Sequence, residues 1–350
     1  MKLCYMRIKN IFLLSWSVLL YLSCNRTQKE MPVVAGMRWV ASGTFTQGAR
    51  SHDNLAMAHE KPAHEVVVSG FYIDTTEVTN AQFAAFVAAT QYITVAERPI
   101  YWEQMKLQLP FGTQKPADSL LLPGALTFKA AQTKLPNLYD FSQWWNWTLG
   151  AHWRQPQGPG STIEGKENHP VVQIAYEDAL AYCEWAGRSL PTEAQWEYAA
   201  RGGLDDIYSW GADGSLLKDR ANSWEGSFPD HNIATDGYVN TAPVASYPPN
   251  TFGLYDMSGN VWEWTQDWYH TKYYRELAAK KSPAKDPKGP KAAFNPNNPY
   301  TQEKVIRGGS FLCNAAYCAS YRASARMASE PMSAAEHIGF RTVLNVDRQP

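Results

Sequence analysis

The chain combines many large aromatic residues with many residues that interrupt regular backbone. Its 350 residues include 14 Trp and 19 Tyr beside 23 Gly and 22 Pro. Glycine and proline disfavour the interiors of helices and strands, whereas buried aromatic rings fill large volumes between irregular segments. The composition therefore predicts an α+β protein with few regular elements, in which aromatic side chains hold long loops in place.

The first 24 residues have the pattern of a bacterial export signal. Lys2, Arg7 and Lys9 supply positive charge, and the apolar run Ile11–Leu22 is too short to be a permanent membrane span. The run ends in an apolar–small–Cys sequence at Cys24, which resembles a lipoprotein lipobox. We expect cleavage before Cys24 and lipidation of this residue. The alternative is an ordinary signal peptide with an incidental cysteine.

Charge and length limit the remaining organisation. The chain has 32 basic and 33 acidic residues and no basic stripe with interleaved aromatics, so we expect no nucleic-acid partner. No internal repeat is evident. The simplest organisation is a signal peptide at 1–24, a tether at 25–32 and one globular domain at 33–346.

Local patterns predict a few regular elements. Residues 66–74 are rich in β-branched and aromatic side chains and predict a strand. Thr79 is a suitable cap for a helix that begins at Asn80, and Thr192 precedes a second predicted helix, Glu193–Arg201. The tryptophans that follow no fixed period are predicted to fill the core between loops.

Two cysteines near the C-terminus are candidates for chemistry. Two of the five cysteines lie in the leader, and Cys183 occupies an apolar helical position, where it is expected to be inert. Cys313 and Cys318 lie five positions apart, close to the hydroxyl of Ser310. Thiolates favour soft metals such as Cu(I), and the same spacing also permits a local disulfide. The residues alone leave both possibilities open.

Two acidic loops are weaker candidates for a metal. Asp256 and Glu263 flank Gly259 in one loop, and the segments 222–223 and 236–238 supply an amide, a carboxylate and carbonyl groups in another. Calcium binds six to eight oxygens that such turns can present. The alternative is that these side chains only bond to nearby backbone amides in Asx-turns.

Several sequence blocks together resemble the formylglycine-generating enzyme family, also called the sulfatase-modifying factor domain. The resemblance covers residues 33 to 345 and implies a single loop-rich, C-type-lectin-like domain. The blocks are Gly70–Asp74, Glu77–Asn80, His169–Val172, Trp185–Glu193, Trp196–Tyr198, Pro248–Asn250, Gly253–Asp256, Gly259–Trp264, Cys313–Cys318 and Gly339–Arg341.

The resemblance implies a specific reaction. Enzymes of this family use O2 to oxidise the cysteine of a Cys-x-Pro-x-Arg motif in sulfatases to Cα-formylglycine. By similarity, Cys313 and Cys318 would hold Cu(I) as thiolates. The other positions that match the family's active-site region are Ser310, Trp262, Tyr317 and Arg326.

The resemblance also implies two calcium sites and a kind of partner. The matching calcium positions are Asn222, Ser223, Asp236 and Tyr238 in the first site, and Asp256, Gly259, Val261 and Glu263 in the second. The expected partners are unfolded or nascent exported sulfatases, met by a monomeric lipoprotein anchored in the periplasm or outer membrane. Two departures from the family leave the substrate groove undefined. Met332 stands where the family usually has Asp, and the loop around residues 96–98 and 118–119 matches poorly.

Two other functions are compatible with the resemblance. Some proteins with this domain are non-catalytic cell-envelope lipoproteins, such as gliding-motility scaffolds, which have no need of a cysteine pair beside Ser310. Relatives that form carbon–sulfur bonds in ergothioneine synthesis use a histidine-ligated iron and an additional domain. No convincing set of three ligands is found among the eight histidines of this chain.

Overall fold

The longest strand among the described residues organises a four-stranded sheet. In the computed structural model, which describes residues 31–346, β9 (Trp262–Trp268) pairs antiparallel with β11 (Lys304–Arg307) and parallel with β13 (Ile338–Gly339). The outer strand β12 (Arg326–Ser329) pairs antiparallel with β11. All four residues of β11 are buried, so the loop that follows this strand starts from the interior of the protein.

The chain divides into two units, residues 1–32 and 33–350, and every element described here belongs to the second. The predicted signal peptide, Cys24 and most of the predicted tether lie outside the described residues. Between residues 31 and 346, no helix is long and apolar enough to cross a membrane.

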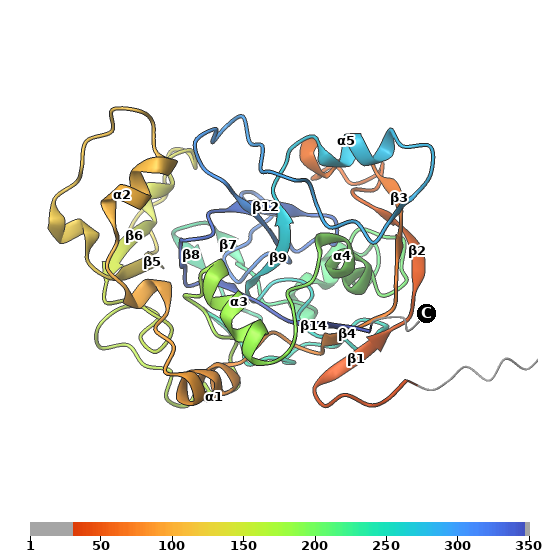
Figure 1. Ribbon diagram of the computed structural model, residues 1–350, viewed down its shortest axis with the longest axis horizontal. Coiled ribbons are helices and arrows are strands. Elements are labelled where there is room, and N and C mark those ends of the chain that lie inside the picture. The colour runs from red at the N-terminus through yellow and green to blue at the C-terminus, as the bar shows by residue number, and fades with distance from the viewer. Residues whose placement is uncertain (1–30, 347–350) are drawn as a thin grey trace, which may run out of the picture. The chain divides into compact units, whose positions relative to one another are not determined.

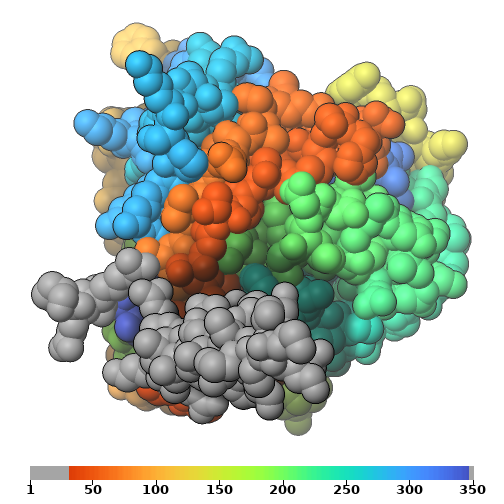
Figure 2. Space-filling view, turned by 90° about the vertical axis from the view of Figure 1, so that its right-hand side faces the viewer, coloured from red at the N-terminus to blue at the C-terminus, as the bar shows by residue number. Residues whose placement is uncertain are grey.

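The strand predicted at residues 66–74 is wrong, because the segment forms two strands in different sheets. β3 (His64–Val68) pairs with β2 (Gly43–Gln47) and with β10 (Ala284–Lys285). β4 (Phe71–Asp74) lies between β1 (Met37–Val40) and β14 (Val343–Asn345). Figure 2 shows the 270–290 region beside the N-terminal strands, as the β10–β3 pairing requires.

The break between β3 and β4 has a local cause. The backbone N–H of Ser69 donates a hydrogen bond to Asp286, and the Ser69 hydroxyl donates a second one to the same carboxylate. A Cβ on Gly70 would lie 2.4 Å from the Trp39 ring, so only glycine fits where the chain leaves β3. The alternation of apolar residues cannot reveal this change of sheet.

The helices agree with their predicted caps. α1 (Asn80–Thr90) begins after Thr79, whose hydroxyl accepts from the N–H of Gln82 while the Gln82 side chain accepts from Thr79. α4 (Glu193–Arg201) has the same capping box and the predicted bounds. The other helices are α2 (Trp102–Met105), α3 (Tyr176–Trp185) and α5 (Tyr273–Ala278). Figure 1 shows α1 and α3 side by side.

Short elements and loops make up much of the remaining chain, as the composition predicts. Two hairpins are formed by β5 (Gly124–Phe128) with β6 (Trp145–Leu149), and by β7 (Gly226–Ser227) with β8 (His231–Asn232). Short 3₁₀ helices are found at Ala58–Glu60, Val95–Glu97, Lys106–Gln108, Asp118–Leu121, Phe141–Gln143 and Gly214–Asp219.

Aromatic side chains pack the core between these loops. The tryptophans that are almost completely buried are Trp144, Trp153, Trp196, Trp262 and Trp264. Phe83 of α1 shows the pattern, because its ring meets Trp153 edge-on at 5.2 Å and stacks on Tyr182 of α3 at 6.1 Å. For the tryptophans that follow no fixed period, the prediction that they fill the core is confirmed for Trp144 and Trp153 and is wrong for Trp147, which is 38% exposed.

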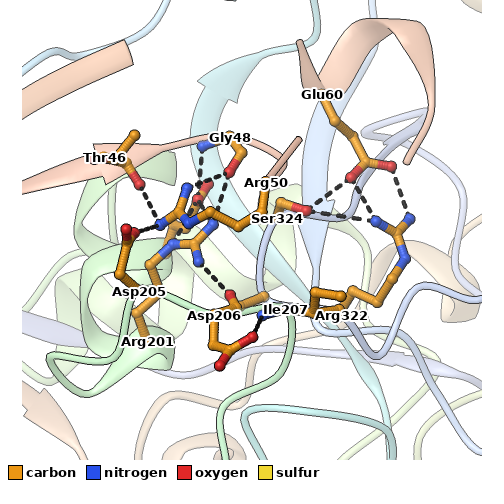
Figure 3. Close-up of polar contacts among 12 residues, drawn as sticks. Thr46, Gly48, Arg50, Glu60, Arg201, Asp205, Asp206, Ile207, Arg322 and Ser324 are labelled. Atoms are coloured by element: carbon orange, nitrogen blue, oxygen red, sulfur yellow. Dashed lines mark hydrogen bonds and ion pairs between the residues drawn. The ribbon is translucent and has the colours of Figure 1, made fainter. Parts of the chain in front are cut away.

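Buried arginines connect segments that are distant in the sequence. Four arginines are among the largest fully buried side chains, namely Arg307, Arg322, Arg326 and Arg341. Arg322 binds Asp53 at 2.7 Å and both oxygens of Glu60 at 2.8 Å. Figure 3 shows the pair formed by Arg322 and Glu60, together with Ser324, which donates to the same carboxylate.

A second cluster joins α4 to the central sheet. Arg307 donates to Glu193 at 3.0 Å and to Glu197 at 2.8 Å, and Arg201 also binds Glu197. Burial alone would raise the pKa of Glu197, but the charges of Arg201 and Arg307 outweigh it and lower this pKa to about 2. The carboxylate therefore stays ionised in the core at neutral pH.

Removal of one partner from these pairs should destabilise the protein strongly. In an Arg322→Met variant, Asp53 and Glu60 stay buried without a cation, so we expect the free energy of unfolding to fall by about 3–5 kcal/mol. Urea denaturation followed by circular dichroism measures the change. Lys115→Met is the control, because Lys115 and Asp118 form an exposed pair that contributes at most about 1 kcal/mol. Equal losses in the two variants would contradict the proposed role of the buried pairs.

Candidate active site

The loop between β11 and β12, residues 308–325, brings Cys313 and Cys318 together and is called the thiol loop below. Gly308 and Gly309 leave the strand with φ angles of 95° and 73°, which are unfavourable for residues with a side chain. A Cβ on Gly309 would lie 2.8 Å from the backbone of residues 320 and 321, so the start and end of the loop are in close contact. The two cysteines form a disulfide in the structure, with their Cα atoms 4.7 Å apart.

Backbone turns fix the positions of the two sulfur atoms. The N–H of Cys313 donates to the carbonyl of Ser310 at 2.8 Å, and the N–H of Cys318 donates to that of Asn314 at 2.7 Å. The N–H of Ser310 also approaches Sγ of Cys313 at 3.4 Å. A donor in this position favours the thiolate form once the disulfide is reduced.

Both cysteines are shielded from water. Cys313 is 1% exposed, Cys318 is 6% exposed, and Ser310 is completely buried. Two sulfur donors held side by side in an apolar environment are a suitable ligand set for a soft ion such as Cu(I). The residues present therefore fit the metal that the resemblance implies, and they equally form the local disulfide that the spacing permits.

Aromatic side chains form one wall beside the pair. The ring of Tyr317 stacks on Phe228 at 4.6 Å and meets Trp144 edge-on at 5.5 Å. Burial raises the pKa of Tyr317, although 37% of this residue is still exposed. Trp262 is buried in the same apolar cluster as the two cysteines. Ser310 and Tyr317 thus lie in the thiol loop itself, and Trp262 shares its apolar cluster.

Arg326 has a different environment from the other predicted residues. Its guanidinium group binds both oxygens of Glu193, at 2.6 and 2.7 Å, and lies 4.5 Å from the centre of the Tyr274 ring. These contacts place Arg326 in the buried ionic cluster at α4. Arg326 thus connects β12 to α4.

Two residues near the thiol loop were missed by the sequence analysis. The His337 ring contacts the Trp145 ring in a tilted arrangement, with the ring centres 4.7 Å apart, and the His337 carbonyl accepts a hydrogen bond from the N–H of Trp262 at 2.9 Å. Burial lowers the pKa of His337 to about 3, so its ring is neutral. Burial also raises the pKa of Glu336 to about 8, although the N–H of Phe128 donates to this carboxyl group. The sequence offered no signal except their position just before the matching block at Gly339.

The first predicted calcium site has oxygen atoms in need of a partner. Oδ1 of Asn222 and Oγ of Ser223 are buried and have no hydrogen-bond partner among the described residues. Asp236 lies beside them, and its two oxygens accept from the N–H groups of Ser223 at 3.2 Å and Tyr238 at 3.0 Å. Burial raises the pKa of Asp236. Three of the four predicted residues thus present side-chain oxygens in one place.

The second predicted site contains an acid that the sequence analysis missed. Asp256 and Glu77 each have one buried carboxylate oxygen without a partner in residues 31–346. Burial raises the pKa of Asp256 to about 6, and burial together with the charge of Asp256 raises the pKa of Glu77 well above its usual value. A cation between these carboxylates would relieve both penalties. Glu77 could not be identified from spacing, because it lies 179 positions before Asp256 in the sequence.

The other acid predicted for this site is already paired. Both oxygens of Glu263 accept from Arg341 at 2.7 Å, and the indole N–H of Trp196 donates to one of them. Val261 is completely buried in the turn between the two acids. No group of three or more His, Cys, Asp or Glu side chains in the described part of the chain is arranged to hold a metal, so backbone carbonyls and amide oxygens are needed to complete either calcium site.

The turn between Asp256 and Glu263 also supports the thiol loop directly. The N–H of Gly259 donates to the carbonyl of Gly308 at 2.8 Å, and the N–H of Phe311 donates to that of Asn260 at 2.9 Å. A Cβ on Gly259 would lie 2.2 Å from the carbonyl oxygen of Asn222. The predicted calcium sites and the cysteine pair are therefore in contact through this turn.

A cavity of about 390 Å³ lies next to the hairpin β5–β6. Its walls include Arg98, Tyr101, Met105, Trp147, Glu330 and Met332. The two acids of the poorly matching loop are not among the residues that line this cavity. Glu97 accepts hydrogen bonds from Thr94, and Asp118 pairs with Lys115. The acids that line the cavity are Glu177 and Glu330, and neither was considered in the sequence analysis.

Comparisons with known proteins agree with the site. Residues 24–346 match the family model described as "Sulfatase-modifying factor enzyme 1-like domain". The chain is 41% identical to the formylglycine-generating enzyme of Thermomonospora curvata over 313 residues, covering 88% of this chain and 93% of that protein. It is also 36% identical to the inactive Cα-formylglycine-generating enzyme 2 of Mus musculus, covering 93% of this chain and 91% of the relative.

A solved structure supports the fold. PvdO from Pseudomonas aeruginosa superposes with a TM-score of 0.58 at 23% sequence identity, covering 89% of this chain and 94% of the other. The expected fold class is confirmed by this likeness and by the family match. From its sequence and its fold, the chain belongs to the family of the formylglycine-generating enzymes, the sulfatase-modifying factors.

Proposed function

We propose that this protein oxidises the cysteine of a Cys-x-Pro-x-Arg motif in sulfatases to Cα-formylglycine, using O2 and a Cu(I) ion held by Cys313 and Cys318. The observation that carries the proposal is the placement of two buried sulfur atoms side by side in an aromatic-walled loop. The identity of 41% to a formylglycine-generating enzyme over most of both chains supports the same reaction.

The chain's own residues prepare the site for this chemistry. Cys313 and Cys318 present thiolates once reduced, and the N–H of Ser310 is directed at Sγ of Cys313. Tyr317, Trp144 and Phe228 exclude water from one side, which protects a reactive thiol from competing reactions. When bound, Cu(I) supplies the one-electron chemistry that ground-state O2 requires.

The change at the substrate is a two-electron oxidation followed by hydrolysis. The thiol hydrogen and one Cβ hydrogen leave as two protons and two electrons, which reduce O2 to hydrogen peroxide, and the side chain becomes a thioaldehyde. Water then replaces sulfur by oxygen, releasing hydrogen sulfide. The substrate must reach the buried sulfur atoms as an extended chain, which is consistent with sulfatases that have not yet folded.

The reaction can be tested with a Cys-x-Pro-x-Arg peptide incubated with the reduced protein, Cu(I) and air. Conversion lowers the peptide mass by about 18 Da, the difference between a thiol and an aldehyde, and we expect Cys313→Ser and Cys318→Ser each to abolish this change. Cys183→Ala is the matched control, because Cys183 is a buried free cysteine of α3 and is not one of the two proposed ligands. Mass spectrometry measures the product.

Copper binding provides a second readout that is independent of turnover. Titration against a chromogenic Cu(I) chelator should show one ion per chain in the parent protein and in Cys183→Ala, and none in the other two variants. Normal copper binding without conversion of any motif peptide would exclude the oxidase. Absence of both would favour the non-catalytic envelope scaffold.

Two calcium ions are proposed to stabilise the loops around the site. Asn222, Ser223 and Asp236 would bind one ion with a carbonyl at Tyr238. Asp256 and Glu77 would bind the other with carbonyls at Gly259 and Val261, while Glu263 is held by Arg341. The support is the set of buried oxygens in both places that have no hydrogen-bond partner between residues 31 and 346. Hard oxygen donors of this kind suit Ca2+.

Calcium should therefore raise the thermal stability of the protein. A ligand present at 100 times its Kd adds about 2.7 kcal/mol to the free energy of unfolding, so 1 mM Ca2+ should raise Tm by several degrees relative to EGTA. In Glu77→Gln this increase in Tm should be smaller, because a neutral amide replaces one carboxylate of the second site. Differential scanning calorimetry measures the increments, with Glu276→Gln, at an exposed position of α5, as the control. An equal increment in Glu77→Gln and the parent would remove Glu77 from the site.

The leader supports a proposal on location. We propose that Cys24 becomes the lipidated N-terminus of an exported lipoprotein, anchored in the periplasm or outer membrane, where exported sulfatases are met. In the native host, metabolic labelling with an alkyne fatty acid should mark the parent protein and fail to mark Cys24→Ala. Labelling of both proteins would contradict the assignment of Cys24.

A further inference from the structure

Residues 272–291 carry a local excess of positive charge. The segment contains seven basic and two acidic residues, a net charge of +5, whereas the remaining 330 residues contain 25 basic and 31 acidic residues. All seven basic side chains are exposed. They are Lys272, Arg275, Lys280, Lys281, Lys285, Lys288 and Lys291. A chain that is almost neutral as a whole therefore presents one strongly basic surface, which is called the basic segment below.

The charge of the basic segment is not neutralised by nearby acids. None of its seven cations forms an ion pair with an acid in residues 31–346. Of its two acids, Glu276 lies 3.9 Å from His270, and Asp286 accepts two hydrogen bonds from Ser69. Opposite charges that are left without partners on a surface attract an external ligand of the other sign. The basic segment is thus available to an anionic partner.

Contacts with the core hold the basic segment in a defined shape. Tyr274 of α5 is buried, and its hydroxyl donates to Glu193 at 3.1 Å. After α5, strand β10 pairs with β3. A Cβ on Gly289 would lie 2.8 Å from Oδ1 of Asp267, so the segment also lies against β9. The lysine side chains consequently extend from a backbone that is fixed to two sheets.

The chemistry of the basic segment favours an extended anionic surface as the partner. Six of its seven cations are lysines, whose ammonium groups act as point charges rather than as planar forks for one anion. None of the seven lines the cavity of about 390 Å³ beside the hairpin β5–β6, or a second cavity of about 40 Å³ next to Asn80. The basic segment therefore offers spread charge without a hollow for a small molecule.

The position of the basic segment agrees with the proposed membrane anchor. Cys24 precedes Val33, the first residue of the globular unit, by nine positions. At about 3.6 Å for each residue, this part of the chain spans at most about 32 Å. Figure 2 shows the 270–290 region on the same face as the N-terminal strands, and Figure 1 shows α2 and the hairpin β5–β6 on the opposite side from β2 and β3.

We propose that the basic segment docks on the anionic phospholipid head groups of the membrane that carries the anchor. This inference rests on the proposed location and is independent of the oxidase. Clustered cations are attracted to an anionic bilayer over about one Debye length, and salt weakens this attraction. Docking by this face leaves the cavity beside β5–β6 directed away from the lipid, where exported proteins can reach it.

A fluorophore on the basic segment of the full protein tests the contact. Ser282→Cys supplies an exposed thiol for labelling, whereas Cys183 is buried and Cys313 is bonded to Cys318. The labelled protein is reconstituted into vesicles of phosphatidylcholine, with or without phosphatidylglycerol, that contain a lipid with a nitroxide head group. We expect quenching to be at least about twofold stronger in the anionic vesicles. In about 1 M NaCl, where the Debye length is about 3 Å, this difference should vanish.

A second labelling position is the control for vesicle binding in general. Gln114→Cys lies in an exposed loop after α2, so its quenching should be the same in both kinds of vesicle. Equal quenching at position 282 in neutral and anionic vesicles would overturn the docking surface. Stronger quenching at both positions in anionic vesicles would overturn it as well, because the protein would then have no preferred face.

Removal of charge gives the complementary test. One variant replaces four lysines of the basic segment by Gln, and a matched variant replaces four exposed lysines from elsewhere. The first carries Lys280→Gln, Lys281→Gln, Lys285→Gln and Lys288→Gln, and the second carries Lys115→Gln, Lys129→Gln, Lys134→Gln and Lys166→Gln. The effect of phosphatidylglycerol on quenching at position 282 should disappear in the first variant and persist in the second, while their circular dichroism agrees. Equal loss in both would assign the attraction to total charge and contradict a specific surface.

The docking surface and the anchor can fail separately. If Cys24 is lipidated and quenching at position 282 is equal in the two kinds of vesicle, only the docking surface is excluded. If the quenching depends on phosphatidylglycerol in a protein that the host does not lipidate, the docking surface stands and Cys24 is excluded as the anchor. Retention on a sulfated polysaccharide together with equal quenching would assign the basic segment to an acidic polymer and overturn lipid docking.

Discussion

Buried pairs of arginine and carboxylate groups determine how the loops of this protein are arranged. Arg307 and Arg322 begin and end the segment that contains the two cysteines, and each binds acids from a different part of the chain. Such pairs add little net stability compared with apolar residues of the same size. Their effect is geometric, because any arrangement that separates the partners leaves a charge buried alone. The thiol loop is consequently held at both ends.

The sides of the loop depend on a second set of contacts. Gly259 and Asn260 hydrogen-bond the backbone on either side of Ser310, and Asn222 contacts the same turn. The oxygens without partners in the described part of the chain lie within this supporting layer. Ion binding there would fix the turn without contacting the substrate. The two proposed kinds of metal site would have separate tasks, since soft sulfur ligands would serve the chemistry and hard oxygen ligands would support the loop.

Sequence reasoning succeeded where the determining interactions are local. The helix Glu193–Arg201 was predicted with its observed bounds because Thr192 and Gln195 form its capping box. The segment 66–74 failed because its break depends on Asp286, far along the chain. The cysteine pair is local and was found, whereas Glu77 and His337 were missed because distant segments create their environments. Periodicity also gives no information on the parallel pairing of β13 with β9.

The ion pairs of Arg322 join residues that are far apart in the sequence, and this has a consequence for biosynthesis. Asp53 and Glu60 precede Arg322 by 269 and 262 residues, so the pair cannot form until nearly the whole chain has been made. Contacts of such long range are slow to form during folding. An incomplete chain would carry Cys313 and Cys318 near its growing end, without the Arg322 contacts that hold the loop. The two cysteines thereby reach their final surroundings only when synthesis of the chain is nearly complete.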